Sequence, residues 1–239
     1  RHSFPTRRSS DLLFVGRGRY DSSNEGVAAS IGAVGVSVAV DGVGRATVAG
    51  AGSISVAGDV AAVSSFGAES AVLLHLIASI DPAVPVLFLE TGKHFPETLA
   101  YRDEIAARLG LTNLINLTPD AELLAKRDEN GLRWSYDPDG CCEIRKVQPL
   151  ARALGEFDAS FTGRKGFQNA TRAGLQTFEL DQTDALGRLK INPLATWSSD
   201  QIRAYFDATG LPAHPLVAQG YPSIGCHPCT AAVKPGEDA

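Results

Sequence analysis

The chain has 239 residues, of which 44% are hydrophobic and 21% charged, with a net charge of −5. This is the composition of a globular protein with an ample core. The acidic balance argues against a general nucleic-acid binder, which is usually basic. No apolar run reaches the roughly 20 residues of a membrane helix. The sequence therefore predicts neither a nucleic-acid partner nor a membrane partner.

The first 55 residues differ from the rest. The chain begins with Arg1 and contains no methionine, so we expect that it was cut from something longer. The opening RHSFPTRRSSDL is basic and rich in serine, but no apolar segment follows it as in a secretory signal peptide. The Gly/Ala/Val-rich stretch up to residue 60 predicts one or two strands or a poorly ordered segment. We interpret residues 1–55 as non-native or poorly ordered, and residues 56–239 as one domain.

From residue 60 onward, strand and helix patterns alternate. Apolar runs predict strands at 60–66, 84–91, 112–119 and 157–163. Helical spacing and end signals predict helices at 69–80, 96–110, 119–131 and 197–212, with a further helix around Arg145 and Leu150. In the last of the four, Ser198 and Gln201 form a capping-box pattern. Strands separated by helices predict an α/β protein with a doubly wound, mostly parallel sheet.

The first candidate loop is SSFGAES, residues 64–70, between a strand and a helix. In such sheets ligands lie beyond the carboxyl ends of the strands. Small and hydroxyl residues with one glycine let backbone N–H groups surround an anion at a helix N-terminus. No Gly-Lys-Ser/Thr follows, so this is not a Walker A loop. An ordinary N-capped turn is the alternative.

The loop after the second predicted strand also carries polar groups. Thr91, Gly92 and Lys93 end the second strand and are candidates for contact with a nucleotide, although a solvated Lys93 is the simpler interpretation.

The loop after the fourth strand is TGRKGFQNATRAG, and it holds Arg164, Lys165 and Arg172. Guanidinium groups bind phosphate or sulfate through paired hydrogen bonds. A solvated surface is again the alternative.

The four cysteines form two pairs, Cys141 with Cys142 and Cys226 with Cys229. Without an export signal, such cysteines usually bind metal or do redox chemistry. Thiolates favour zinc or iron–sulfur clusters. Adjacent side chains on a helix point about 100° apart, which suits a bulky cubane better than one tetrahedral ion. Structural zinc, a redox disulfide within CHPC and unliganded thiols remain open.

Six segments together resemble the assimilatory adenylyl-sulfate reductases, the iron–sulfur branch of the phosphoadenylyl-sulfate reductase family. They are VSSFGAES, LFLETGKHFPETLAYRDEIAARLGL, CCEIRKVQPLARAL, TGRKGFQNATRA, KINPLATWSSDQIRAYF and HPLVAQGYPSIGCHPCT. The resemblance covers roughly Val60 to Asp238. It implies an adenine nucleotide alpha-hydrolase-like (PP-loop) fold and a 4Fe–4S cluster on Cys141, Cys142, Cys226 and Cys229.

The resemblance also implies an activity. It is the thioredoxin-dependent, cytoplasmic reduction of adenosine 5′-phosphosulfate (APS) to sulfite and AMP, in assimilatory sulfate reduction for cysteine biosynthesis. An alternative is the 3′-phosphorylated substrate, PAPS. A second alternative is a zinc-stabilised nucleotide-binding protein without reductase activity. A homo-oligomer remains open.

Site residues follow from the same resemblance. Lys146 matches a family lysine placed between cluster and substrate, where it acts electrostatically. The residues implied to bind the substrate are Ser64, Ser65, Phe66, Gly67, Glu69, Ser70, Thr91, Gly92, Gly163, Arg164 and Lys165.

One departure from the family pattern concerns the nucleophile. In this family a cysteine in a C-terminal Glu-Cys-Gly-Leu-His segment attacks the sulfate sulfur and forms S-sulfocysteine. No such segment occurs in this sequence. We therefore expect a fragment, truncated before the catalytic segment, that holds cluster and nucleotide but does not turn over.

Overall fold

Three short antiparallel strands precede the main sheet in the computed structural model, which describes residues 26–30, 37–41, 45–49, 56–168, 174–180 and 187–233. They are β1 (Gly26–Ser30), β2 (Ser37–Asp41) and β3 (Arg45–Ala49), and β3 pairs with the start of β4 (Val56–Ser64). The sequence predicted one or two strands in this stretch, and the structure has three. That residues 1–55 are non-native stays a prediction.

The main sheet has six strands in the order β6–β5–β4–β7–β9–β8. Within these six strands, five run parallel, and the edge strand β8 is antiparallel to β9. The further bounds are β5 (Val86–Leu89), β6 (Leu114–Leu117), β7 (Ala159–Thr162), β8 (Phe178–Leu180) and β9 (Leu189–Ile191). The predicted doubly wound, mostly parallel sheet is confirmed. The short strands β8 and β9 were not predicted.

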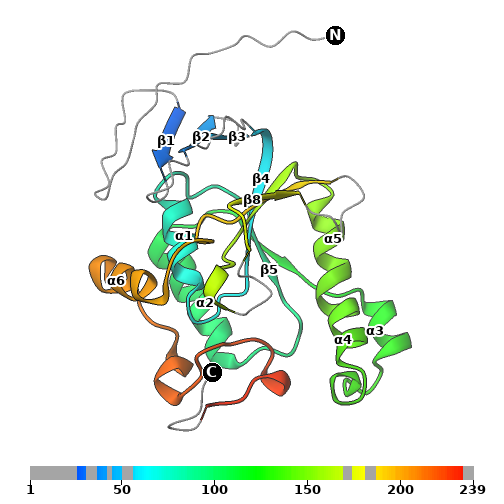
Figure 1. Ribbon diagram of the computed structural model, residues 1–239. Helices are drawn as coiled ribbons and strands as arrows, with labels where there is room; N and C mark the ends of the chain where they lie inside the picture. The colour runs from blue at the N-terminus through cyan, green and yellow to red at the C-terminus, as the bar shows by residue number, and fades with distance from the viewer. Residues whose placement is uncertain are drawn as a thin grey trace, which may run out of the picture.

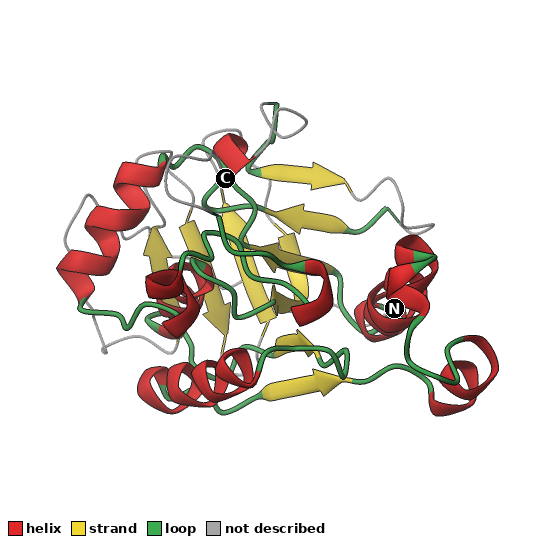
Figure 2. Cartoon of the chain, turned by 90° about the horizontal axis from the view of Figure 1, so that it is seen from below, coloured by secondary structure: helices red, strands yellow, loops and turns green. Residues whose placement is uncertain are grey.

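Helices flank the strands on both sides (Figures 1 and 2). One group contains α1 (Ser70–Ala78), α2 (Pro96–Leu109) and α6 (Ser199–Thr209); the other contains α3 (Ala121–Arg127), α4 (Pro138–Cys142) and α5 (Gln148–Leu154). The capping box predicted for α6 is present. Of the helices in the described ranges, none combines the length and apolar character needed to cross a membrane.

Short helical turns connect these elements. They are η1 (Arg133–Ser135), η3 (Gly166–Gln168), η5 (Pro215–Gln219) and η6 (His227–Cys229). A π-helical turn, η2 (Glu143–Val147), joins α4 to α5. Because π-helical turns often occur at functional sites, η2 is notable for its position directly after the adjacent cysteines.

The main core cluster packs around β4, which sits between β5 and β7. Val60 and Ala62 of β4, Phe88 of β5 and Phe161 of β7 are almost fully buried. After β4 the chain continues to β5 and β6 on one side, and β7 then lies on the other side of β4. This reversal of strand order leaves a crevice at the carboxyl ends of β4 and β7, which is where α/β sheets bind ligands.

Candidate functional site

A pocket of about 750 Å³ opens at the carboxyl ends of β4 and β7. Its size is in the range of cofactor and small-molecule sites. Eight of the residues expected to bind substrate line this pocket: Ser64, Ser65, Gly67, Glu69, Ser70, Gly163, Arg164 and Lys165. Residues 222–224, which lead into the C-x-x-C pair, close another side. Arg172 lies outside the described residues.

Phe66 anchors the pocket loop to the core. Its φ of 49° is in the left-handed region, which is uncommon for a residue other than glycine. Its N–H donates to Ser64 Oγ at 3.2 Å. The ring is fully buried and packs edge-on against Phe88, with 5.5 Å between ring centroids. The side chain of Phe66 therefore points into the core, and Phe66 is not among the pocket-lining residues.

Gly67 allows two backbones to approach closely. A Cβ at this position would lie 2.9 Å from the carbonyl oxygen of Ile224. Ile224 is two residues before Cys226, so the pocket loop packs directly against the segment that carries the second cysteine pair.

Lys165 forms a shielded ion pair at the base of the pocket. Its side chain is only 4% exposed, and Nζ lies 2.8 Å from Glu69 Oε2. Nζ also donates to the carbonyl oxygen of Gly163 at 3.2 Å. This ammonium group is therefore held in one place by the protein.

Arg164 is positioned by a second polar cluster. Its NH2 group lies 2.7 Å from Glu179 Oε2, and its Nε donates to Asn192 Oδ1 at 3.2 Å. Burial raises the pKa of Glu179, but hydrogen bonds from the Gln176 N–H and Arg164 outweigh it, so the net pKa is lowered. The Glu179 carboxylate therefore stays ionised beside the guanidinium. Neither Glu179 nor the buried Asn192 stands in a recognisable sequence motif, so neither was predicted as a site residue.

Thr91 lies beside a cysteine and is not among the residues that line the pocket. Its side chain is fully buried, with Oγ1 3.3 Å from Cys226 Sγ. Its carbonyl oxygen accepts a hydrogen bond of 2.7 Å from Arg145 NH1. Gly92, which is exposed, does not line the pocket either.

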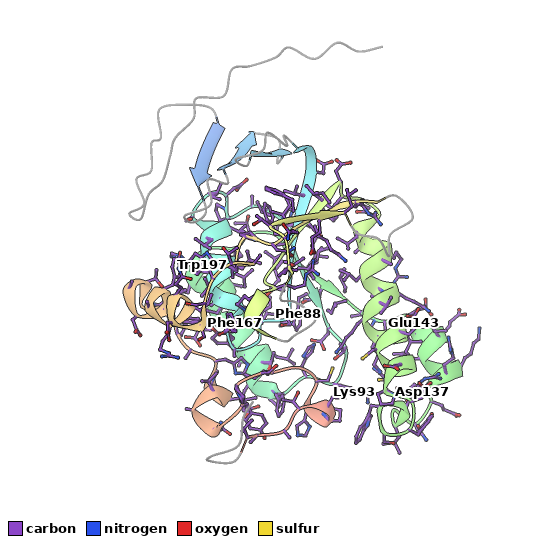
Figure 3. All side chains as sticks on the ribbon, viewed as in Figure 1. Phe88, Lys93, Asp137, Glu143, Phe167 and Trp197 are labelled. Carbon is purple, nitrogen blue, oxygen red and sulfur yellow. The ribbon has the colours of Figure 1, made fainter. Side chains whose placement is uncertain are left out.

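The loop after β5 lies between the two cysteine pairs. The carbonyl oxygen of Lys93 accepts a hydrogen bond of 2.8 Å from the backbone N–H of His227, inside the C-x-x-C pair. On the other side, burial raises the pKa of Cys141, while the cations Arg145 and Lys93 oppose the rise. In Figure 3, Lys93 lies between the red C-terminal segment and α4. All four cysteines are free thiols.

Both cysteine pairs lie near the loop after β5, but they do not form a site for a single metal ion. Across the described residues, no three His, Cys, Asp or Glu side chains are close enough to hold one metal ion. A zinc ion would need its sulfur ligands at about 2.3 Å, whereas a 4Fe–4S cluster takes one thiolate on each of several irons. The donor set, four free thiols in two pairs, fits a cluster by its chemistry.

A buried ion pair fixes Arg145 between the cysteine pairs. Arg145 NH2 lies 2.6 Å from Asp128 Oδ2, and the Asp128 side chain is fully buried. Asp128 Oδ1 accepts the backbone N–H of Arg133 at 2.8 Å. Sequence reasoning missed Asp128, because an aspartate between a helix and a glycine turn looks like a solvated residue. Lys146, the next residue along the π-helical turn, is half-buried.

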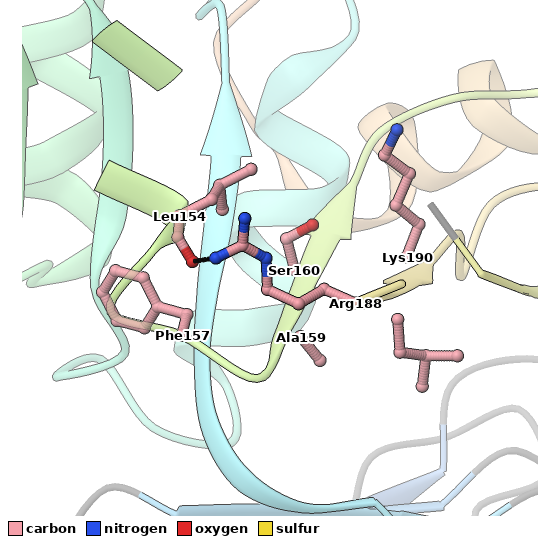
Figure 4. A pocket seen from close by; sticks show the side chains of 7 residues that line it. Leu154, Phe157, Ala159, Ser160, Arg188 and Lys190 are labelled. Carbon is pink, nitrogen blue, oxygen red and sulfur yellow. Dashed lines mark hydrogen bonds between the residues drawn. The ribbon is translucent and has the colours of Figure 1, made fainter. Parts of the chain in front are cut away.

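A much smaller cavity, of about 10 Å³, lies at the amino ends of β7 and β9 (Figure 4). Arg188 closes it by donating to the carbonyl oxygen of Leu154. It has room for about one water molecule. The nucleotide-sized pocket is therefore at the opposite, carboxyl end of the strands.

Comparison with known proteins agrees with this geometry. The family model described as "Phosphoadenosine phosphosulfate reductase domain" matches residues 59–232, so the chain belongs to this family. Within it, the chain is 54% identical over 182 residues to an adenosine 5′-phosphosulfate reductase of Chelativorans sp., covering 76% of this chain and 72% of that protein. A phosphoadenosine 5′-phosphosulfate reductase of Gloeobacter violaceus is 42% identical, covering 73% of each chain.

Solved structures show the same fold. The crystal structure of a phosphoadenylyl-sulfate reductase from Candida auris matches with a TM-score of 0.60 and 29% identity, covering 72% of this chain and 83% of that one. An FMN adenylyltransferase of Candida glabrata shares the fold alone, with a TM-score of 0.51 and 18% identity. The adenylyl-sulfate reductase resemblance and the PP-loop fold predicted from the sequence are confirmed.

Replacing Gly67 by Ala tests the close approach of the pocket loop. The added methyl group displaces either the loop or the Ile224 backbone, so we expect the free energy of unfolding to fall by about 1–3 kcal/mol. Denaturant titration measures this change. Gly174→Ala is the matched control, because nothing lies within 4 Å of a Cβ at Gly174. Equal stability of the two variants would contradict the packing argument.

Removing the Asp128 carboxylate tests the buried ion pair. Asp128→Ala leaves Arg145 without its partner, and breaking a buried pair in this way costs about 3–5 kcal/mol. The exposed Asp103→Ala is the control, with an expected loss of about 0–1 kcal/mol. Because the folded-state pKa of Asp128 is lowered, its contribution is present above the unfolded pKa of about 3.9 and is lost as the pH falls through the folded pKa. Unfolding measured from pH 7 to acid should show the wild type converging on Asp128→Asn, and parallel curves would contradict the assignment.

Proposed function

We propose that the chain binds APS in the pocket between β4 and β7, as part of an enzyme that reduces it to sulfite and AMP. The observation that carries the proposal is the pocket itself. A hydroxyl-rich loop at the N-terminus of α1 and two fixed cations meet at the strand-order reversal. This combination suits a nucleotide that carries a phosphate and a sulfate.

Loop and cations take different parts of this ligand. The backbone N–H groups of 64–70 and the first turn of α1 suit the charged phosphate. Arg164 and Lys165 suit the sulfonyl oxygens, whose negative charge has to be stabilised in the transition state. Both cations are already held in place by carboxylates, so little rearrangement is needed when the substrate arrives. In this proposal the ligand is not contacted by Gly92 or by the side chains of Thr91 and Phe66. These residues contribute by holding the two loops in position.

The four cysteines are proposed to hold a 4Fe–4S cluster next to this pocket. Two contacts support the placement: Gly67 against Ile224, and Thr91 against Cys226. When bound, such a cluster supplies an electrostatic and redox-active centre whose properties depend on nearby hydrogen bonds and charges. Arg145 and Lys146 offset the negative charge of the thiolates, and Lys146 is proposed to face the sulfate as an electrostatic residue.

The reaction that we propose proceeds in two steps. A cysteine thiolate attacks the sulfate sulfur, the S–O bond breaks, and AMP leaves with the electron pair. A thioredoxin dithiol then attacks the resulting S-sulfocysteine, releases sulfite and becomes oxidised. Since all four cysteines are assigned as ligands, the attacking cysteine is one outside these 239 residues. The domain at 56–239 then has the task of binding the nucleotide and the cluster.

APS is preferred over PAPS in this proposal because relatives named for the APS reaction are 54% identical to the chain over 182 aligned residues. PAPS remains the second candidate because a relative named for it is 42% identical.

Cluster formation is tested by anaerobic reconstitution with iron and sulfide. We expect a brown protein with broad visible absorbance and about four irons per chain, and Cys226→Ser should lose the colour while still binding AMP. Thr230→Ser is the matched control on the same segment. A colourless wild type with one tightly bound zinc would contradict the cluster assignment.

Arg164→Ala tests anion binding. Losing a charge-assisted hydrogen bond should weaken AMP binding by about 1.5–3 kcal/mol, measured by titration calorimetry. The exposed Arg203 on α6 supplies a control of equal charge change. An affinity unchanged by Arg164→Ala would show that this guanidinium stays with Glu179 and does not bind the ligand.

A further inference from the structure

The loop after β5 contacts both segments that carry cysteines. Toward the C-x-x-C pair, His94 forms a backbone bridge with Cys226. The carbonyl oxygen of Lys93 accepts a hydrogen bond of 2.8 Å from the backbone N–H of His227. The N–H of Lys93 donates to Thr91 Oγ1 at 3.2 Å, and this oxygen lies 3.3 Å from Cys226 Sγ. The backbone of Lys93 is therefore held against the second cysteine pair.

The side chain of Lys93 reaches in the other direction. Its ammonium group donates a hydrogen bond of 2.5 Å to the carbonyl oxygen of Gly131. Gly131 has a φ of 69°, in the left-handed region that favours glycine, and its N–H donates to the carbonyl oxygen of Asp128 at 2.9 Å. In Figure 3, Lys93 lies between the C-terminal segment and α4. One residue thus binds the C-terminal segment through its backbone and the turn before α4 through its side chain.

The turn that Lys93 binds leads into the adjacent cysteines. On η1, directly after this turn, the NH2 group of Arg133 lies 2.5 Å from Asp137 Oδ2. Asp137 Oδ1 accepts the N–H of Gly140 at 2.9 Å and so caps α4, the helix that ends at Cys142. A Cβ at Gly140 would collide with the Asp137 carboxylate, so the cap is tightly packed. These contacts connect Lys93 to the adjacent cysteines.

Lys93 also brings positive charge to the cysteines. Together with Arg145, it acts electrostatically on Cys141. Arg145 is paired with the buried Asp128 carboxylate at 2.6 Å, whereas the ammonium group of Lys93 donates to an uncharged carbonyl oxygen. Charges and hydrogen bonds around an iron–sulfur cluster set its properties, and residues behind the ligands hold the ligands in place. Lys93 can serve in both ways.

We propose that Lys93 is a positioning residue for the iron–sulfur cluster, which holds the adjacent cysteines at a fixed separation from the C-x-x-C pair and places a positive charge beside the thiolates. The inference rests on the proposed function and deepens it, since it assigns the arrangement of the four ligands to one side chain. Lys93 is half-buried, and its removal leaves no buried charge without a partner. It can therefore be replaced with less damage to the fold than Asp128 or Arg145.

The test follows cluster retention in the full 239-residue chain, reconstituted anaerobically with iron and sulfide. An iron chelator is then added, and the decay of visible absorbance gives the lifetime of the cluster. Lys93→Met removes the ammonium group and keeps the length of the side chain. Its cluster should be lost about tenfold faster than that of the wild type, which is the scale on which residues behind metal ligands change metal affinity. Lys93→Arg keeps the charge and the donor and should restore a lifetime close to that of the wild type.

Two controls make the result specific. Lys126→Met makes the same charge change on the exposed side of α3 and should leave the lifetime of the cluster unchanged. Circular dichroism of the cluster-free chains should be the same for the wild type and all variants, because Lys93 acts on the arrangement of the cysteines and not on the fold as a whole.

The outcomes separate the inference from the proposed function. A wild-type lifetime in Lys93→Met overturns the role of Lys93 and leaves the proposed cluster standing, and so does a Lys93→Arg cluster that decays as fast as that of Lys93→Met. A Lys93→Met chain that is unfolded before reconstitution also overturns the inference, because Lys93 would then serve the whole fold. A wild type that takes up no iron overturns the proposed cluster together with the inference.

Discussion

The reversal of strand order at β4 is the constraint on which the site depends. Because β5 and β7 lie on opposite sides of β4, the loops after β4 and β7 diverge and leave a crevice between them. The loop of 64–70 and the cations of 164–165 come from these two strands, more than ninety residues apart in sequence. Phe66 keeps the first loop fixed by burying its ring in the core.

A second constraint connects the crevice to the cysteines. Residues 222–224 form one wall of the pocket and continue into Cys226. The Thr91 side chain contacts Cys226, and its carbonyl oxygen accepts from Arg145, which Asp128 fixes in the core. The segment that carries Cys226 thus connects the pocket wall to Thr91 and, through Thr91, to Arg145. A few hydrogen bonds therefore link the pocket to the surroundings of the cysteines.

The sequence predicted the alternating strands and helices well, because buried strands and amphipathic helices have strong local patterns. The strand at β4, the helix α6 and its Ser198 cap followed from such patterns. The short edge strands β8 and β9 were missed, since three residues give no periodicity to read. The position of Ser64 and Arg164 at the pocket was predictable, because both follow the carboxyl ends of parallel strands, where such sheets bind ligands.

What the sequence did not predict was which charges would compensate one another. Glu69 was expected only as part of a loop, and Glu179 lies on a strand that was not predicted, yet each neutralises a pocket cation. Such pairs join residues about 15 to 96 positions apart, so they appear only after folding. They also change how the cationic loop is interpreted, because the positive charges of Arg164 and Lys165 are each paired with a carboxylate. Both pocket cations are therefore held by carboxylates, one from the N-terminus of α1 and one from the edge strand β8.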